Sequence, residues 1–379
     1  LLYIAAFTPK EHKVTMIDET NGPVERFEKY DIVGISGMTM HANRMYALAD
    51  EYRKIGCHVV LGGVHVSFMT EEALQHCDTV MVKEGELSWQ EFLRDFEEGR
   101  PKRIYQPGGV FDLCRLPKPD LSLVDGPAYQ APRGTLNSIV ATRGCPNHCA
   151  FCCVRKLFDG PFRIRTADSI VEEIAGFDEN IIIFQDDNIV GNFAFAKELF
   201  TRMIPMKRLW GAQGSINVAA NRELLDLMAD SGCRTLFVGF ESINRKNLAA
   251  MGKSGVNRVE EYEENIKRLH DKGIRIFGSF IVGLDDDEES VFDDIYEFCF
   301  RNKIDFPIVN CLTPFPGTET YKQLEAEERI IDRDWSRYNL TNVVIRPKNM
   351  EPDKLQFQYN TLVHYLNKMT YANMQELHG

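Results

Sequence analysis

Aliphatic runs alternate with amphipathic stretches along residues 1–105. The runs lack polar alternation, which is typical of parallel strands buried on both faces. The stretches between them have apolar residues at the three- and four-residue spacing of a helix. This succession predicts an open α/β sheet of the doubly wound, Rossmann-like type. The predicted strands are 13–18, 31–37, 58–63 and 79–86, and the predicted helices are 42–56 and 88–99.

The start of the chain is apolar but does not read as a signal peptide. Residues 1–7 lack both a basic flank and a small-residue cleavage site. We interpret them as the inside of a helix, and we expect the first strand of the domain to lie upstream of Leu1.

A second alternation follows a segment that we interpret as a linker. Residues 106–134 hold five prolines and show little periodicity. Six β/α units then predict a partial, TIM-like (β/α)6 barrel over residues 135–320, with its chemistry at the carboxyl ends of the strands. Residues 321–379 are predicted to form a helical cap. The predicted barrel strands are 136–144, 180–188, 208–215, 234–242, 275–284 and 306–315, and the predicted helices are 166–177, 221–232, 259–273 and 287–303.

Composition narrows the classes of partner. The formal net charge is -12 and the sequence has no basic stripe, which argues against a nucleic-acid partner. No run approaches the ~20 apolar residues of a transmembrane helix, so no membrane span is expected. The ten cysteines are too scattered for a secreted disulfide scaffold, which favours a reducing cytoplasm. Six of them lie in apolar surroundings and are interpreted as core thiols.

The remaining cysteines cluster in the sequence RGCPNHCAFC at 143–152, which directly follows an apolar strand. Cys145, Cys149 and Cys152 have the spacing C-x-x-x-C-x-x-C, which lets one loop wrap three thiolates around an iron–sulfur cluster. Three ligands leave one iron open to bind a cofactor or substrate. The alternative is a zinc site closed by Cys153 or His148 as the fourth ligand.

This motif resembles the radical S-adenosylmethionine superfamily over roughly residues 136–320. The resemblance implies that Cys145, Cys149 and Cys152 ligate a 4Fe-4S cluster whose open iron binds S-adenosylmethionine. It also implies reductive cleavage of that cofactor to a 5'-deoxyadenosyl radical, with electrons from an external flavodoxin or ferredoxin. Phe151 then occupies the aromatic position that lies beside the adenine in the family.

Later strand ends match further segments of the family. Asp186 and Asp187 end the second barrel strand, where one carboxylate would accept from the methionine ammonium, which only donates. The sequence leaves open which of the two does so. Glu241 and Ser242 are expected to hold the ribose hydroxyls or the methionine moiety, although an ordinary ion pair also explains a strand-end carboxylate. The fifth strand offers the adenine-binding segment Gly278, Ile281 and Gly283, although a plain barrel strand would also contain such glycines.

The amino-terminal domain resembles the cobalamin-binding domain of one class of this superfamily. Small and hydroxyl residues at its strand ends would let a corrin lie against the sheet edge. No Asp-x-His-x-x-Gly motif is present, and His41 and His65 are interpreted as surface or packing residues rather than cobalt ligands. The alternative is a domain that binds no cofactor. The proposed cobalamin contacts are Ser36, Gly37, Thr39, Gly62, Gly63, Gly85 and Glu86.

Three segments resemble a narrower subgroup that includes hopanoid-lipid and bacteriochlorophyll methylases. They are 186–192, 239–244 with Met251-Gly252-Lys253, and 334–355. The subgroup implies C-methylation of an unactivated carbon in a lipid, tetrapyrrole or other natural product. Two alternatives remain: a radical enzyme that cyclises or rearranges its substrate or transfers another fragment of S-adenosylmethionine without methylation, and a non-enzymatic metal-binding or electron-transfer protein.

Overall fold

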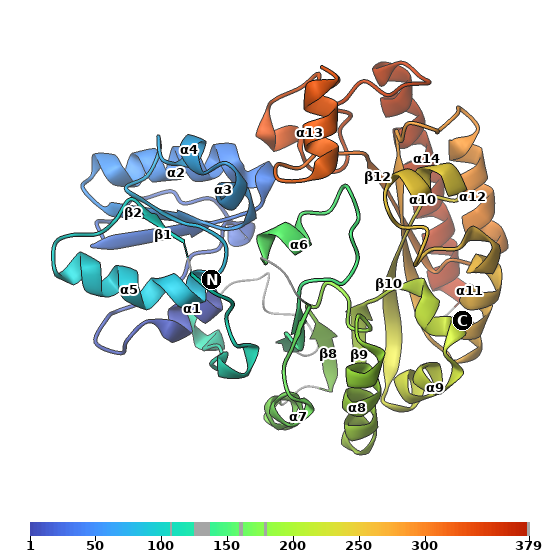
Figure 1. Cartoon of the computed structure of the whole chain (residues 1–379), viewed down its shortest axis with the longest axis horizontal. Helices are drawn as coiled ribbons and strands as arrows, with labels where there is room; N and C mark the ends of the chain where they lie inside the picture. Colours follow the sequence, from blue (N-terminus) through green and yellow to red (C-terminus); the bar gives the residue numbers. More distant parts are fainter. Residues whose placement is uncertain (107, 125–136, 159–161, 178–179, 377–379) are drawn as a thin grey trace. The chain divides into compact units, whose positions relative to one another are not determined.

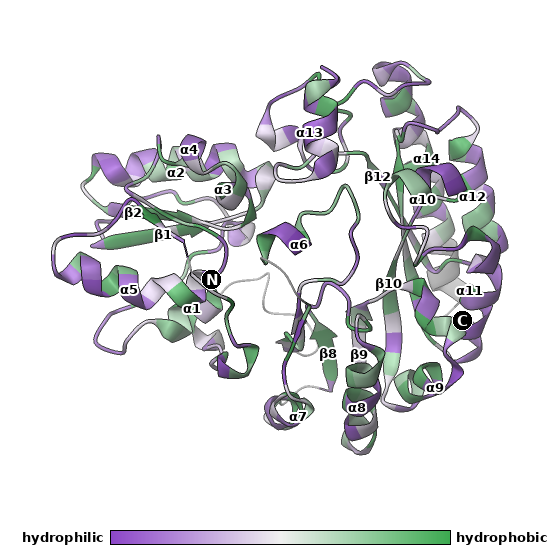
Figure 2. Cartoon of the chain, viewed as in Figure 1, coloured by the Kyte–Doolittle hydropathy of each residue, from purple (hydrophilic) through white to green (hydrophobic). Residues whose placement is uncertain are grey.

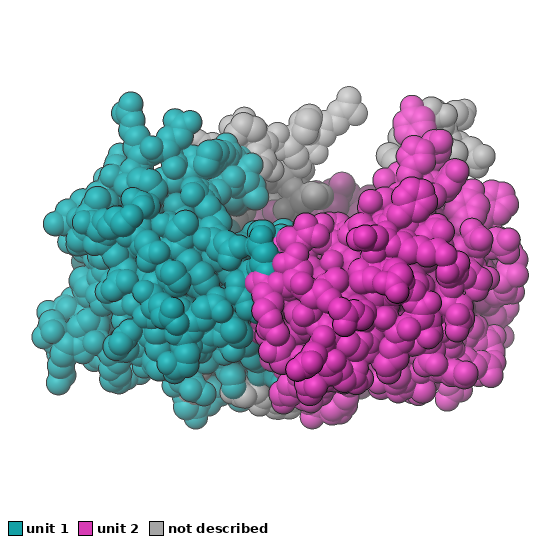
Figure 3. Space-filling view, turned by 90° about the horizontal axis from the view of Figure 1, so that it is seen from above, with its two compact units in different colours: residues 1–135, 156–159, 334–336 teal, residues 136–155, 160–333, 337–379 magenta. Residues whose placement is uncertain are grey.

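The computed structural model describes residues 1–106, 108–124, 137–158, 162–177 and 180–376 (Figure 1). It divides into two compact units, which Figure 3 distinguishes by colour. Unit 1 consists of Leu1–Thr135, Lys156–Asp159 and Asp334–Ser336, and unit 2 of Leu136–Arg155, Gly160–Arg333 and Arg337–Gly379.

Unit 1 is a parallel four-stranded sheet in the order β1-β2-β3-β4. Helices α2, α3 and α4 lie on one face, and α1 and α5 lie on the other (Figure 1). Along β2, Val59 and Leu61 belong to one hydrophobic cluster and Val60 to another, because successive side chains of a strand point to opposite faces. The predicted doubly wound α/β fold is therefore confirmed. Its elements are α1 Leu2–Phe7, β1 Ile32–Ser36, α2 Ala42–Lys54, β2 His58–Gly62, α3 Val64–Phe68, α4 Thr70–Ala73, β3 Thr79–Met81, α5 Gly85–Glu97 and β4 Ile104–Tyr105.

Hydropathy follows these layers. Figure 2 shows β1 and β2 as mainly hydrophobic, whereas α2 and α5 alternate hydrophobic and hydrophilic residues. Residues 1–7 contribute helix α1, as expected. Residues 13–18 differ from the prediction, because they join no strand ladder and their side chains alternate between exposed and half-buried. An aliphatic run forms a buried strand only where a neighbouring strand edge pairs with it and both faces are covered.

Unit 2 is a parallel six-stranded sheet in the order β12-β11-β10-β9-β8-β5. The strands follow one another in chain order and the sheet is open between β5 and β12, which is the architecture of a partial barrel (Figure 1). The predicted fold class is confirmed here too. The strands are β5 Asn137–Ile139, β8 Ile181–Phe184, β9 Leu209–Gln213, β10 Cys233–Glu241, β11 Arg275–Val282 and β12 Phe306–Cys311.

Helices separate these strands, and two more follow them. The run predicted as one strand at 136–144 is divided, since Thr142–Arg143 forms β6, which pairs antiparallel with β7 at Arg163–Ile164. Two helices after β12, the second of them 25 residues long, give the helical carboxyl-terminal region that was predicted. The helices of unit 2 are α7 Ala167–Ala175, α8 Phe193–Met203, α9 Arg222–Asp230, α10 Arg245–Ala250, α11 Tyr262–Asp271, α12 Val291–Arg301, α13 Glu319–Ala326 and α14 Pro352–Glu376, while α6 Val154–Leu157 spans the unit boundary.

Helix α8 was not predicted from the sequence. An asparagine is a common N-cap and could have indicated where this helix begins. The Asn192 side chain accepts a hydrogen bond from the Phe195 N–H at 3.1 Å. Its buried residues include Phe195, Leu199 and Met203, which have the four-residue spacing of a helix face. None of the helices that the structure describes has the length and apolar content needed to cross a bilayer.

Candidate active site

Two adjacent carboxylates, just beyond the end of β8, hold the backbone that leads into the cysteine loop of unit 2. Asp186 accepts hydrogen bonds from the Ala141 N–H at 3.2 Å and from both the N–H and the hydroxyl of Thr142. Asp187 accepts from the Gly144 N–H at 3.1 Å. Adjacent acids of one strand end therefore fix the backbone that leads into the first cysteine.

The far side of the loop is held by two other elements. The Ala150 N–H donates to the Met251 carbonyl at 3.0 Å, and the Ala150 carbonyl accepts from the Thr320 N–H at 3.1 Å. Gly252 has a φ of +70°, and a Cβ there would lie 3.0 Å from the His148 carbonyl oxygen. The turn after α10 therefore requires glycine both for its backbone conformation and for its close approach to the cysteine loop.

Cys145, Cys149 and Cys152 are partly exposed and form no disulfide. Burial raises the pKa of all three thiols, that of Cys152 to about 12. Metal coordination would be what keeps them as thiolates. Within the described ranges, no three His, Cys, Asp or Glu side chains gather around a point that could hold a single metal ion. A cubane cluster takes its three thiolates at three separate irons, so its ligands surround a larger volume than those of one ion.

The residues at the end of β8 have different environments. Asp186 is 3% exposed, and its carboxylate is occupied by the three hydrogen bonds described above. Burial raises the pKa of this carboxyl to about 7. Asp187 is less buried and accepts from a single backbone N–H among the described residues. The structure thus assigns Asp186 to the support of the loop, and Asp187 is the freer of the two acids.

Asn188, the next residue, was not singled out from the sequence. It is 4% exposed, and its Oδ1 has no hydrogen-bond partner in the part of the chain that the structure describes. Buried polar atoms normally have partners, so an unpartnered acceptor beside the cysteine loop marks a place for a donor. The signal in the sequence was only its position at a strand end.

Glu241 lies at an irregular end of β10. The strand bulges between Gly239 and Glu241, and Glu241 has a φ of +64°, which is unusual for a residue other than glycine. Its Oε1 lies 2.5 Å from the Lys253 Nζ, with both side chains about 90% buried. A strained backbone conformation of this kind persists only where the surrounding contacts impose it.

The backbone carbonyl groups at this bulge accept hydrogen bonds from two side chains. Asn257 donates to the Gly239 and Phe240 carbonyls at 2.8 Å, and Lys253 donates to the Gly239 carbonyl at 3.0 Å. Ser242 is buried, and its hydroxyl oxygen accepts from the Asn244 N–H at 3.0 Å. The expected pair Glu241 and Ser242 therefore occupies a rigid strand end.

The glycines of β11 have packing reasons of their own. A Cβ at Gly278 would lie 3.0 Å from Ile304 and 3.1 Å from the Phe240 ring, so this position packs against neighbouring side chains. Gly283 has a φ of +88°, and a Cβ there would lie 2.8 Å from Leu355. Ile281 is 8% exposed. Their expected contact with adenine stays a prediction.

Asp287 supports the turn that follows β11. Its Oδ2 accepts from the Gly283 and Leu284 N–H groups, both at 2.9 Å, and its Oδ1 accepts from the Asn247 side chain at 2.7 Å. It is 2% exposed, and burial raises its pKa to about 7.

The raised pKa of Asp287 predicts a pH-dependent stability. The folded chain holds this proton up to about pH 7, whereas the unfolded chain releases it near 3.8. The free energy of unfolding should therefore fall as pH rises from about 4 to about 7, at up to ~1.4 kcal/mol per unit for one group. Denaturation at pH 5 and 7.5 should show a smaller difference in Asp287→Asn than in the unaltered chain. The exposed Asp293 on α12 serves as control, since Asp293→Asn should keep the full difference.

In unit 1, the strand ends bring four predicted cobalamin contacts together. Gly63 has a φ of +100°, and a Cβ there would lie 2.8 Å from both the Gly37 carbonyl oxygen and the Ser36 Oγ. Gly62 ends β2, beside the end of β1 at Ser36. Thr39 is buried at 3% exposure, whereas Gly85 and Glu86 are half-buried at the start of α5. The carboxyl ends of parallel strands share one sheet edge, which is where open α/β sheets bind ligands.

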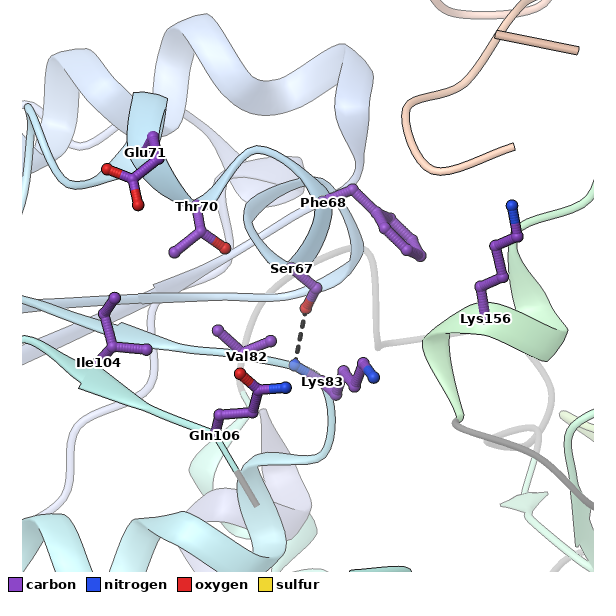
Figure 4. A pocket seen from close by; sticks show the side chains of 9 residues that line it. All are labelled: Ser67, Phe68, Thr70, Glu71, Val82, Lys83, Ile104, Gln106 and Lys156. Atoms are coloured by element: carbon purple, nitrogen blue, oxygen red, sulfur yellow. Dashed lines mark hydrogen bonds between the residues drawn. The ribbon is translucent and has the colours of Figure 1, made fainter. Parts of the chain in front are cut away.

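A cavity of about 540 Å³ opens near this edge in unit 1 (Figure 4). At its centre the Ser67 hydroxyl donates to the Gly63 carbonyl and accepts from the Lys83 N–H, each at 2.8 Å. This cavity was not predicted from the sequence, because residues from separate loops line it together with Lys156, which follows the cysteine motif. It is lined by Ser67, Phe68, Thr70, Glu71, Val82, Lys83, Ile104, Gln106 and Lys156.

The two histidines named in the sequence analysis have protein partners. His65 is 1% exposed, its Nε2 lies 3.1 Å from the Tyr46 hydroxyl, and its ring packs edge-on against Trp335. Burial lowers its pKa. The Nδ1 of His41 accepts from the Met38 N–H at 3.2 Å.

Comparison with known proteins extends these observations. The model of the radical SAM superfamily matches residues 139–299, and that of the B12 binding domain matches residues 1–93. The chain is 33% identical over 363 residues to bacteriochlorophyllide d C-12(1)-methyltransferase of Chlorobaculum tepidum, an alignment covering 94% of this chain and 79% of that protein. It is 27% identical over 350 residues to hopanoid C-2 methylase of Rhodopseudomonas palustris, covering 88% of this chain and 65% of that protein.

A solved structure shows the same fold. The radical S-adenosylmethionine methyltransferase TsrM from Kitasatospora setae, with cobalamin and a 4Fe-4S cluster bound, superposes with a TM-score of 0.64 at 16% identity. The superposition covers 79% of this chain and 65% of that chain.

The chain belongs to the radical S-adenosylmethionine superfamily, in the class that carries a B12-binding domain. More narrowly, it is an enzyme of the cobalamin-dependent C-methyltransferase family, as its sequence resemblance indicated. Its cofactors are a 4Fe-4S cluster, S-adenosylmethionine and cobalamin. Membership of this enzyme family excludes the two alternatives of a non-enzymatic metal protein and of a first domain that binds no cofactor.

Proposed function

We propose that this enzyme transfers a methyl group to an unactivated carbon of a lipid, a tetrapyrrole or another small natural product. The observation that carries the proposal is the presence in one chain of the three-cysteine loop at the partial-barrel strand ends and of the glycine-lined sheet edge in unit 1. The similarity to enzymes named for bacteriochlorophyllide d and hopanoid methylation supports this substrate class.

Cys145, Cys149 and Cys152 would hold the cluster, with their loop positioned by Asp186, Gly252 and the other contacts described above. When bound and reduced, the cluster with S-adenosylmethionine supplies a 5'-deoxyadenosyl radical, and methylcobalamin supplies the methyl group.

The chain's own residues would bind and orient these cofactors. The ammonium of S-adenosylmethionine only donates hydrogen bonds, and Asp187 and the Oδ1 of Asn188 offer acceptors near the loop. Glu241 and Ser242 would bind the ribose or methionine moiety. Phe151, Ile281 and the backbone at Gly278 and Gly283 would form the adenine site.

In unit 1, the cobalamin would lie against the edge formed by the β1 and β2 ends. Glycine at 62 and 63 leaves the backbone open to close approach, and Ser36 and Thr39 offer hydroxyl groups. Gly37, Gly85 and Glu86 complete the proposed contacts. The cavity beside Ser67 would take one of the corrin's amide side chains, since its lining mixes apolar and polar groups.

Reduction of the cluster requires a partner outside this chain. We propose a one-electron protein donor of the flavodoxin or ferredoxin type, in a reducing cytoplasm where the thiols stay free.

Anaerobically purified protein provides the test of the proposed function. It should carry iron and sulfide for one cluster and about one cobalamin, and after reduction it should convert S-adenosylmethionine to 5'-deoxyadenosine. Bacteriochlorophyllide d and a hopanoid should be offered separately with methyl-deuterated S-adenosylmethionine. Label in a product heavier by one methyl group supports methylation. A product that gains no methyl group supports cyclisation, rearrangement or transfer of another S-adenosylmethionine fragment instead.

A further inference from the structure

Asn188 has a second feature that cofactor binding does not explain. Its Nδ2 lies 3.0 Å from the Ser215 Oγ and 4.0 Å from the Sγ of Cys145. All three residues belong to unit 2, and Asn188 is 96% buried. An amide with two N–H groups thus faces one hydroxyl and one cluster thiol.

The backbone places this amide firmly. The Ile189 N–H donates to the Gln213 carbonyl of β9 at 2.9 Å, and the Gly191 N–H donates to the Asn188 carbonyl at 2.9 Å. The residues that directly follow Asn188 therefore hold the segment after β8 against the end of β9. Ser215 lies two residues beyond the end of β9, so the hydroxyl that orients the amide comes from the loop after the adjacent strand.

The orientation of the amide follows from the chemistry of its neighbours. Turning it over would direct Oδ1 at the sulfur, and a metal-bound thiolate is itself an acceptor. A hydroxyl can donate or accept, so Ser215 tolerates either orientation. The thiolate therefore selects the orientation in which Nδ2 faces Cys145.

We propose that Asn188 is a positioning residue that donates an N–H···S hydrogen bond to Cys145 and so raises the reduction potential of the cluster. The proposal rests on the proposed function only in that a 4Fe-4S cluster binds at Cys145. Reduction adds one electron from the external donor to the cluster and moves no atom between molecules. The added negative charge spreads onto the thiolate sulfurs, where a donor stabilises it, and hydrogen bonds to these sulfurs are among the determinants of cluster potential.

A redox titration of the full-length protein tests this proposal. The cluster is reconstituted under anaerobic conditions without S-adenosylmethionine, and its reduced form is followed by electron paramagnetic resonance. Asn188→Ala should shift the equilibrium toward the oxidised cluster by about tenfold, which is ~59 mV for one electron. Asn188→Asp keeps the shape but lacks the donor and adds a charge, so it should lower the potential at least as much.

Two further variants separate this role from a merely structural one. Ser215→Ala removes the hydroxyl that orients the amide and should lower the potential by less than Asn188→Ala. Asn192→Ala removes the cap of α8, four residues further along, and should leave the potential unchanged. Variants are compared at equal iron content, because a structural defect reduces the amount of cluster and leaves the potential of the remaining cluster unaltered.

The outcomes distinguish a failure of the hydrogen-bond proposal from a failure of the proposed function. An unchanged potential in both Asn188→Ala and Asn188→Asp would overturn the hydrogen-bond proposal while leaving the cluster assignment intact. If the unaltered chain forms no reducible 4Fe-4S cluster, the proposed function fails and this proposal fails with it.

Discussion

Cys149→Ala is expected to lose the 4Fe-4S cluster and to reduce formation of 5'-deoxyadenosine to background, a loss of several orders of magnitude, because the cofactors supply the chemistry that the protein cannot. Cys149 is the central one of the three proposed ligands, between the Gly252 contact at His148 and the Ala150 hydrogen bonds. Two thiolates on the remaining loop would leave two irons without a protein ligand. Iron content, the absorption spectrum and 5'-deoxyadenosine after reduction measure the effect.

The matched control is the fourth cysteine of the same segment. Cys153 directly follows Cys152 and is also partly exposed. The family pattern gives it no ligand role, so Cys153→Ala should retain iron and cleavage activity. If Cys149→Ala still cleaves S-adenosylmethionine, the assignment of the cluster to these cysteines is wrong. Loss of the cluster in Cys153→Ala would instead favour a metal site with four protein ligands.

Lys253→Met is expected to have the second-largest effect, on stability. Lys253 and Glu241 form an ion pair at 2.5 Å with side chains 11% and 10% exposed, and Lys253 also binds the Gly239 carbonyl. Removing one partner leaves a buried charge uncompensated, which costs about 3–5 kcal/mol. The conformation of Glu241 at φ +64° should relax as well, since this lysine is one of the groups that hold the bulge. Chemical denaturation of the metal-free chain measures the loss.

Two comparisons show whether burial is the cause. Lys267→Met removes an ion pair with Asp271 that has the similar distance of 2.6 Å but exposed side chains, and it should change stability little. Glu241→Gln combined with Lys253→Met removes both charges and should be more stable than Lys253→Met alone. Equal losses in Lys253→Met and Lys267→Met would contradict the argument from burial.

The predicted fold class depends on short stretches of chain and agrees with the structure, although some single strands do not: the predicted strand 79–86 is a strand only at Thr79–Met81. The spacing of Cys145, Cys149 and Cys152 is local, and the alternation of strands and helices is a periodicity within a few residues. Helix α8 could also have been predicted from the sequence, because Asn192 caps it and its buried residues have helical spacing. Residues 13–18 had a strand-like pattern, but pattern alone does not provide a partner strand.

The roles of individual strand-end residues did not follow from the sequence in the same way. Asp186, Asp187 and Asn188 are adjacent in the loop after β8, yet their side chains have different partners. The sequence could therefore propose an acid there without showing that Asp186 holds the loop and that Asn188 faces Cys145. Gly278 likewise matched a family segment, while its packing against Phe240 and Ile304 depends on side chains from other elements.

By itself, the sequence determined the class of fold and the cofactors, because both are encoded in residue types at fixed short spacings, while the ligand role of Cys145, Cys149 and Cys152 stays a prediction. Only the tertiary structure decided the pairing of Lys253 with Glu241, the need for glycine at 252 and the donor beside Cys145. These contacts join residues on different strands and turns. Their geometry depends on strand register and loop packing, which no short segment of the sequence encodes.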